Sequence, residues 1–182
     1  MPPGSVRRRT DIVYSRILVI LSAVFGAAQA HAVDWQWPAP EWAALAFEQA
    51  GVGLGADGAE SRYVIAAHVN PSILFGDFDG DHRTDVAVLV RDSQSSKIGI
   101  AIARQEGAVE LLGAGKSFGN GGDDFSWLDH WYTFTRGPVE PGADETPPPV
   151  LAGDALYVEE SESASGLIYY TGSGFAWYQQ GD

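Results

Sequence analysis

An acidic loop that runs directly into an apolar segment is the feature that most restricts the fold of this chain. Asp77, Asp79 and Asp81 alternate along the loop, and Asp85 stands immediately before the apolar residues 86–90. A short run of Val, Ala and Leu bounded by polar residues is typical of a β-strand. The pattern therefore predicts a tight loop that enters a β-strand, and it does not fit a loop between two helices.

Other short apolar or alternating segments lie on either side of this strand. Turn residues such as Gly, Ser and Gln separate them, which is the pattern of hairpins joined by short connections. We therefore predict a mainly β fold, a meander of antiparallel sheets. Besides residues 85–90, the predicted strands are 62–69, 98–103, 109–112, 155–159, 167–170 and 175–178.

One helix is expected before the strands, over residues 41–50. The segment is rich in good helix formers, and Gly51 follows where a glycine often ends a helix. The helical period places four residues on one face, which we expect to pack against the sheet. These residues are Trp42, Leu45, Ala46 and Gln49.

Residues 1–32 have the order of a secretory signal, with arginines before an apolar core and small residues after it. The core, residues 17–28, is shorter than the roughly 20 residues of a spanning helix. We expect cleavage after Ala30 or Ala32 and export to the periplasm or the medium. Residues 33–182 would then be a single domain without a membrane anchor, and retention of the segment as an anchor is the alternative.

Charge and composition exclude several functions. Four of the 11 basic and one of the 24 acidic residues lie within 1–32, so residues 33–182 carry 7 basic and 23 acidic residues, a net charge of −16. Such a chain does not favour nucleic acid or anionic membranes. The charge indicates attraction for cations or a basic partner, or it serves solubility alone. The absence of cysteine excludes disulfides, a thiol nucleophile and a thiolate zinc site.

The alternating aspartates favour calcium as the ligand of the loop. Calcium binds 6–8 hard oxygen atoms in a tolerant geometry. Carboxylates so close together repel one another strongly without a cation. Magnesium seldom uses an all-protein cage, and zinc prefers cysteine and histidine. The predicted ligands are the side chains of Asp77, Asp79, Asp81 and Asp85 and the backbone carbonyl of Arg83.

The segment from Phe75 to Asp81, which closes on Asp85 and enters an apolar strand, resembles the calcium loop of FG-GAP repeats. These repeats occur in integrin α-subunit propellers and in bacterial proteins with VCBS repeats. The resemblance covers residues 73–90 and a single copy. It implies calcium binding between two strands of a sheet like a propeller blade. His82 departs from the pattern, which has glycine there, because the position favours positive φ.

A second segment, later in the chain, combines carboxylates, a histidine and aromatic side chains. Three interpretations stay open for it. Asp124 and Asp129 are the candidate acid and base if the segment is the active site of a glycoside hydrolase. Trp127, Trp131 and Tyr132 are the candidate contacts if it binds a protein partner. In the third interpretation, the aromatic residues fill the core while the acids face water.

Together these features predict an exported, non-catalytic calcium-binding protein that binds another protein or a component of the cell envelope. A secreted hydrolase of glycans or peptidoglycan is the alternative from another class. An inhibitor or immunity protein against such a hydrolase is the second alternative.

Overall fold

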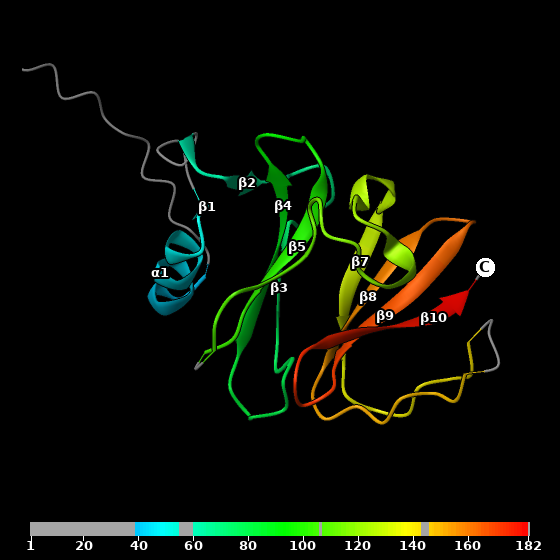
Figure 1. The fold of residues 1–182 in the computed structure, drawn as a ribbon. Helices are drawn as coiled ribbons and strands as arrows, with labels where there is room; N and C mark the ends of the chain where they lie inside the picture. The colour runs from blue at the N-terminus through cyan, green and yellow to red at the C-terminus, as the bar shows by residue number, and fades with distance from the viewer. Residues whose placement is uncertain (1–38, 55–59, 106, 143–145, 182) are drawn as a thin grey trace, which may run out of the picture. The chain divides into compact units, whose positions relative to one another are not determined.

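The computed structural model describes residues 39–54, 60–105, 107–142 and 146–181. The predicted signal segment, 1–32, lies outside the described residues. Within them, no helix combines the length and the apolar character needed to cross a membrane. The elements in chain order (Figure 1) are α1 (Glu41–Gln49), β1 (Val52–Gly53), β2 (Tyr63–Ile65), β3 (Ile73–Gly76), β4 (Asp85–Asp92), β5 (Ile98–Ala103), β6 (Glu110–Gly113), the 3₁₀ turns η2 (Gly119–Gly121) and η3 (Phe125–Trp127), β7 (His130–Phe134), β8 (Ala155–Glu160), β9 (Ala164–Tyr170) and β10 (Phe175–Gly181). The mainly β fold with a short N-terminal helix is confirmed.

The first sheet has the order β1-β2-β4-β5-β6, and β3 also pairs with β4. Its centre is the predicted meander of β4, β5 and β6, in which Val88 lies opposite Ala101 and Ile100 lies opposite Leu112. β2 and β3 pair with successive parts of β4, both antiparallel. β1 runs parallel to β2, so this sheet is mixed rather than wholly antiparallel.

Both faces of β4 are covered, which explains why its sequence is continuously apolar. Val86 and Val88 belong to a core cluster that also contains Phe47 of α1. Ala87 and Leu89, which point to the opposite face because side chains alternate along a strand, belong to a cluster shared with the second sheet. In Figure 1, α1 lies beside one face of the first sheet, and β7 to β10 lie on the other side.

The second sheet is a four-stranded antiparallel meander in the order β10-β9-β8-β7. Its C-terminal hairpin pairs Tyr170 with Phe175, as predicted, and Gly172 in the turn has a φ of 93°. β7, which pairs Trp131 with Val158, is not among the predicted strands. Because aromatic residues occur throughout this segment, its sequence pattern does not reveal the short strand.

The buried face of α1 differs from the prediction. Ala43 and Phe47 are fully buried, whereas Leu45 is 51% exposed and Gln49 is also exposed. The helix is apolar around much of its circumference, so the sequence alone does not determine which stripe meets the sheet. The other two residues of the predicted face, Trp42 and Ala46, are partly buried against the same cluster.

Candidate metal centre

The acidic loop connects β3 to β4, which pair as an antiparallel hairpin with Gly76 opposite Asp85. The last residue before the loop and the first residue of β4 are therefore neighbours. The loop returns to the sheet where the buried strand begins, as the sequence predicts. Phe78, within the loop, is fully buried and anchors it to the core between the sheets.

Three of the predicted ligands come together in this loop. One carboxylate oxygen from each of Asp77, Asp79 and Asp85 lies within 4.8 Å of the others. Hard oxygen donors at this spacing suit calcium better than a softer metal. Two like unit charges about 4 Å apart repel by roughly 1 kcal/mol in water and roughly 4 kcal/mol near a protein surface. A bound cation would therefore relieve an existing repulsion.

Asp85 is fully buried at the base of the loop. Its Oδ2 accepts hydrogen bonds from the backbone N–H of Phe78 at 2.9 Å and of Asp79 at 3.3 Å, and its Oδ1 accepts one from Gln105 at 3.2 Å. Burial first, and then the charge of Asp79, raise the pKa of Asp85 to about 6, although these three N–H groups act in the opposite direction. The carboxylate is thus held in place in an environment that opposes its charge.

Asp77 organises the turn that follows it. Its Oδ1 accepts a hydrogen bond from Gly80 N at 2.8 Å and its Oδ2 one from His82 N at 3.1 Å. Gly80 has a φ of 83° and His82 a φ of 69°. The positive φ expected at position 82 is therefore present, and histidine adopts it. The Nδ1 atom of His82 also lies 3.7 Å from Asp77 Oδ2.

Asp81 does not join the group formed by the other three aspartates. It is exposed, and its Oδ1 accepts a hydrogen bond from the backbone N–H of Arg83 at 2.8 Å. In the structure it therefore stabilises the turn. Ligation by Asp81 and by the Arg83 carbonyl stays a prediction.

Arg104 is a neighbour of the site that the sequence did not indicate. Its Nη1 lies 3.5 Å from Asp79 Oδ2 and donates a hydrogen bond to the Tyr170 hydroxyl at 3.1 Å. The guanidinium also lies over the Tyr170 ring, 4.8 Å from its centroid. It places a positive charge beside one predicted ligand, where it would compete with a metal ion. No sequence signal links residue 104 to the loop, because β-sheet pairing brings them together.

Asp154 is the second neighbour that the sequence did not indicate. Its Oδ2 accepts a hydrogen bond from Asp77 N at 3.1 Å, and its own N–H donates to the Asp77 carbonyl at 2.6 Å. A Cβ added at Gly153 would overlap the Asp77 carbonyl oxygen, so this close approach requires glycine. Asp77 and Asp154 also line an open surface cavity of about 460 Å³ together with His82.

The aromatic residues proposed as partner contacts have different environments. Trp131 is 1% exposed, and its Nε1 donates a hydrogen bond to the Pro71 carbonyl at 2.6 Å. It therefore belongs to the core and not to a binding surface, which corrects its inclusion among the contacts. Trp127 is partly buried against the same core. Tyr132 is 39% exposed and stacks on Tyr157 with 4.8 Å between ring centroids.

The acids of the same segment have structural partners. Asp124 Oδ1 accepts hydrogen bonds from Ile98 N at 2.9 Å and Ser126 N at 3.1 Å, which caps η3. Burial acts to raise the pKa of Asp124, but these N–H groups outweigh it and the pKa is lowered. Asp129 accepts from the backbone N–H of Ser161 at 3.1 Å. A general acid needs a raised pKa, so Asp124 is not suited to that role.

In comparisons with protein-family models, curated proteins and solved structures, no match to this chain is found.

Proposed function

We propose that this protein is an exported, non-catalytic calcium-binding protein, and that it binds another protein or a component of the cell envelope. The β3–β4 loop is the proposed calcium site, and its likeness to FG-GAP loops supports the choice of ion. The observation that carries the proposal is the grouping of Asp77, Asp79 and the fully buried Asp85 within 4.8 Å. A buried carboxylate beside another carboxylate favours a bound cation.

Calcium should stabilise the fold, because an ion that binds only the folded state stabilises it by RT ln(1 + [L]/Kd). Calcium-binding modules of extracellular proteins often have a Kd of about 10⁻⁴–10⁻³ M. With calcium at about ten times Kd, the gain is about 1.4 kcal/mol. For a domain of this size the melting temperature should rise by about 3–6 °C. Magnesium at the same concentration should have a much smaller effect.

Thermal melting of metal-free protein with calcium, magnesium or chelator tests the proposal. Asp79→Ala should lose the calcium response. Its melting temperature in chelator should stay close to that of the wild type, since removal of the repulsion between residues 79 and 85 offsets the lost contact with Arg104. Glu48→Ala removes an exposed carboxylate from α1 and should respond to calcium like the wild type. Identical wild-type curves with calcium and chelator, with metal analysis showing a metal-free starting sample, would contradict calcium binding.

Export is tested separately. Fractionation of cells that produce the full chain should place the protein in the periplasm or medium, with an N-terminus at His31 or Val33. An intact N-terminus in the membrane fraction would contradict it.

A further inference from the structure

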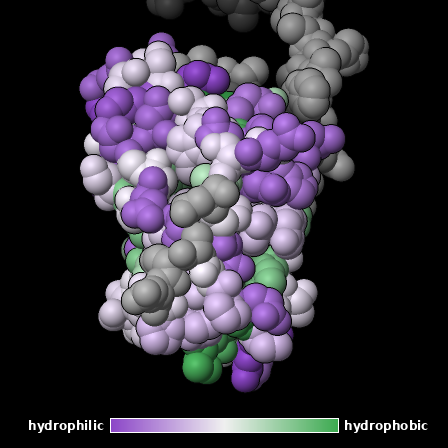
Figure 2. All heavy atoms as spheres, turned by 90° about the vertical axis from the view of Figure 1, so that its right-hand side faces the viewer, coloured by the Kyte–Doolittle hydropathy of each residue, from purple (hydrophilic) through white to green (hydrophobic). Residues whose placement is uncertain are grey.

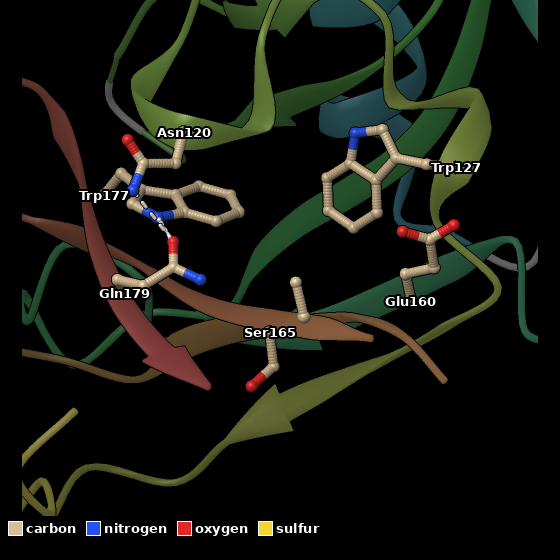
Figure 3. Close-up of a pocket in the computed structure, with 7 residues that line it drawn as sticks. Asn120, Trp127, Glu160, Ser165, Trp177 and Gln179 are labelled. Atoms are coloured by element: carbon tan, nitrogen blue, oxygen red, sulfur yellow. Dashed lines mark hydrogen bonds between the residues drawn. The ribbon is translucent and has the colours of Figure 1, made fainter. Parts of the chain in front are cut away.

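A cavity on the side of the molecule away from the acidic loop has the composition of a ligand site. Its volume is about 390 Å³, within the range of pockets that bind small groups. The cavity is lined by η2, by η3, by the end of β8 and by the hairpin of β9 and β10 (Figure 3). The side chains that matter for its chemistry are Asn120, Trp127, Glu160, Ser165, Trp177 and Gln179.

The two tryptophans line the cavity with rings whose N–H groups already have hydrogen-bond acceptors. Trp127 Nε1 donates to the Gly121 carbonyl at 3.0 Å, and Trp177 Nε1 donates to Gln179 Oε1 at 3.0 Å. The rings lie nearly perpendicular, at 78°, with 6.3 Å between their centroids. Because both N–H groups are already bonded, a ligand can contact these rings only through their π surfaces and edges. Indole faces attract organic cations and apolar surfaces.

Trp177 is held in one position by its surroundings. A Cβ added at Gly166 or Gly119 would overlap this side chain, so the two glycines leave the space that it fills. Gln179, which is 9% exposed, also accepts a hydrogen bond from Asn120 at 3.0 Å. The pocket is therefore formed before any ligand enters, which lowers the entropic cost of binding.

The charge of the pocket and its surroundings is negative. Its lining contains the carboxylate of Glu160 and no lysine, arginine or histidine among the described residues. None of the ion pairs in the described ranges involves Glu160. An adjoining cavity of about 310 Å³ shares Glu160 and Ser165 and adds Glu159 and Glu162. Glu159 Oε2 lies 3.2 Å from His130 Nδ1, whereas Glu160 and Glu162 line the cavities without an ion-pair partner among the described residues.

We propose that this pocket binds an arginine side chain of a partner protein, with a second basic residue of the same segment in the adjoining cavity. A guanidinium is planar, so it stacks on indole faces, and it also pairs with a carboxylate through two parallel hydrogen bonds. The pocket places both kinds of group together, the indole ring of Trp127 for stacking and the carboxylate of Glu160 for pairing, while Trp177 forms the opposite wall (Figure 3). The inference rests on the binding role proposed above, and it specifies that the partner is a protein with basic side chains.

The visible surface does not favour a large apolar partner. Figure 2 shows the side of the molecule on which the C-terminal hairpin lies in Figure 1. Hydrophilic residues predominate there, and the hydrophobic areas are small and separate. Because residues 33–182 carry a net charge of −16, the protein should attract basic partners electrostatically.

Calorimetry with a matched pair of peptides tests the proposal. Acetyl-Gly-Arg-Gly-Arg-Gly-amide should bind and should change the tryptophan fluorescence. The same peptide with both arginines replaced by citrulline keeps the planar shape but carries no charge, and it should bind about tenfold more weakly or not at all. Affinity for the arginine peptide should fall as salt is raised, because exposed charges are screened.

Variants locate the binding. Glu160, which is exposed, should contribute a few fold, so Glu160→Gln should weaken binding of the arginine peptide by that factor. Trp127→Phe should also weaken it a few fold because Phe holds a cation less well than Trp. Glu48→Gln, on α1, should bind like the wild type. Thermal melting confirms that each variant is folded. Equal binding of the arginine and citrulline peptides, or binding unaffected by Glu160→Gln and Trp127→Phe, would overturn the proposal.

Two further measurements distinguish an arginine pocket from the calcium loop and from a glycan site. Asp79→Ala should retain arginine-peptide binding, so failure of the calcium site and failure of this pocket are distinguishable. Neutral chito-oligosaccharides should not displace the peptide. If they bind in the pocket while the arginine peptide does not, the site recognises a glycan and the proposal is wrong.

Discussion

Asp77 and Asp154, 77 residues apart, are joined by two reciprocal hydrogen bonds. The Asp77 N–H donates to Asp154 Oδ2 at 3.1 Å, and the Asp154 N–H donates to the Asp77 carbonyl at 2.6 Å. Asp154 Oδ1 also accepts from Arg136 N at 2.9 Å. The start of the acidic loop is therefore held by the residue that precedes β8 of the second sheet. The two sheets share a core, and this contact adds a polar connection at its edge.

Asp154→Ala should weaken calcium binding without removing a ligand. The change deletes two acceptors, which should lower the free energy of unfolding by about 1–3 kcal/mol. Residues that orient metal ligands typically contribute 10–100-fold in affinity, and because Asp77 keeps its other hydrogen bonds, about tenfold is expected here. Calcium titration by calorimetry measures the affinity, and Glu48→Ala serves as the control. An unchanged calcium affinity would show that Asp154 does not position Asp77.

Arg104→Met should have the opposite effect on calcium. The substitution removes a positive charge that lies 3.5 Å from Asp79 Oδ2 and keeps an apolar side chain beside Tyr170. Because like charges repel, calcium should bind several fold more tightly to the variant, with a larger gain at low salt. Arg91→Met removes an exposed arginine of β4 from outside this contact and is the matched control. Weaker calcium binding to Arg104→Met alone would show that Arg104 organises the site instead of competing for it.

Trp131→Phe tests the core position of a residue that the sequence suggests for partner binding. The variant loses the hydrogen bond to the Pro71 carbonyl and leaves a small cavity, at a combined cost of about 2 kcal/mol. The melting temperature should fall by about 4–8 °C. Tyr132→Phe, on the exposed face of the same strand, should change the stability by no more than about 0.5 kcal/mol. Equal effects of the two substitutions would contradict the burial of Trp131.

Local patterns in the sequence predict the hairpins well. β5 has the predicted bounds, because an apolar strand between polar turns has few alternatives. Gly51 has a φ of 77° after α1, as its position at the helix end implies. The acidic loop enters β4 at Asp85 as expected. In each case the signal and the structure involve neighbouring residues.

Long-range neighbours could not be predicted in this way. Arg104 and Asp154 reach the loop through strand pairing and through contacts between the sheets, and neither has a spacing that relates it to the aspartates. The burial of Trp131 likewise depends on the packing of β7 against the first sheet. A single sequence indicates which residues are suited to calcium, but the residues that orient them or compete with the ion are determined by the tertiary fold.

Stability without metal should depend on pH through Asp85. Its folded-state pKa of about 6 lies above the ordinary value of 3.8, so between these values the folded state holds a proton that the unfolded state releases. The contribution of Asp85 is therefore fully present below about pH 4 and is lost as pH rises through 6, by about 3 kcal/mol. Asp85→Asn cannot titrate, so its free energy of unfolding, relative to the wild type, should increase by about 2–2.5 kcal/mol between pH 4 and 7. Urea unfolding of both metal-free proteins measures this difference. The other titrating groups contribute equally to both proteins and therefore cancel. Saturating calcium should abolish the decline in wild-type stability with pH, because the ion pairs with the charged carboxylate. If the difference in unfolding free energy between wild type and variant is constant with pH, the raised pKa is contradicted.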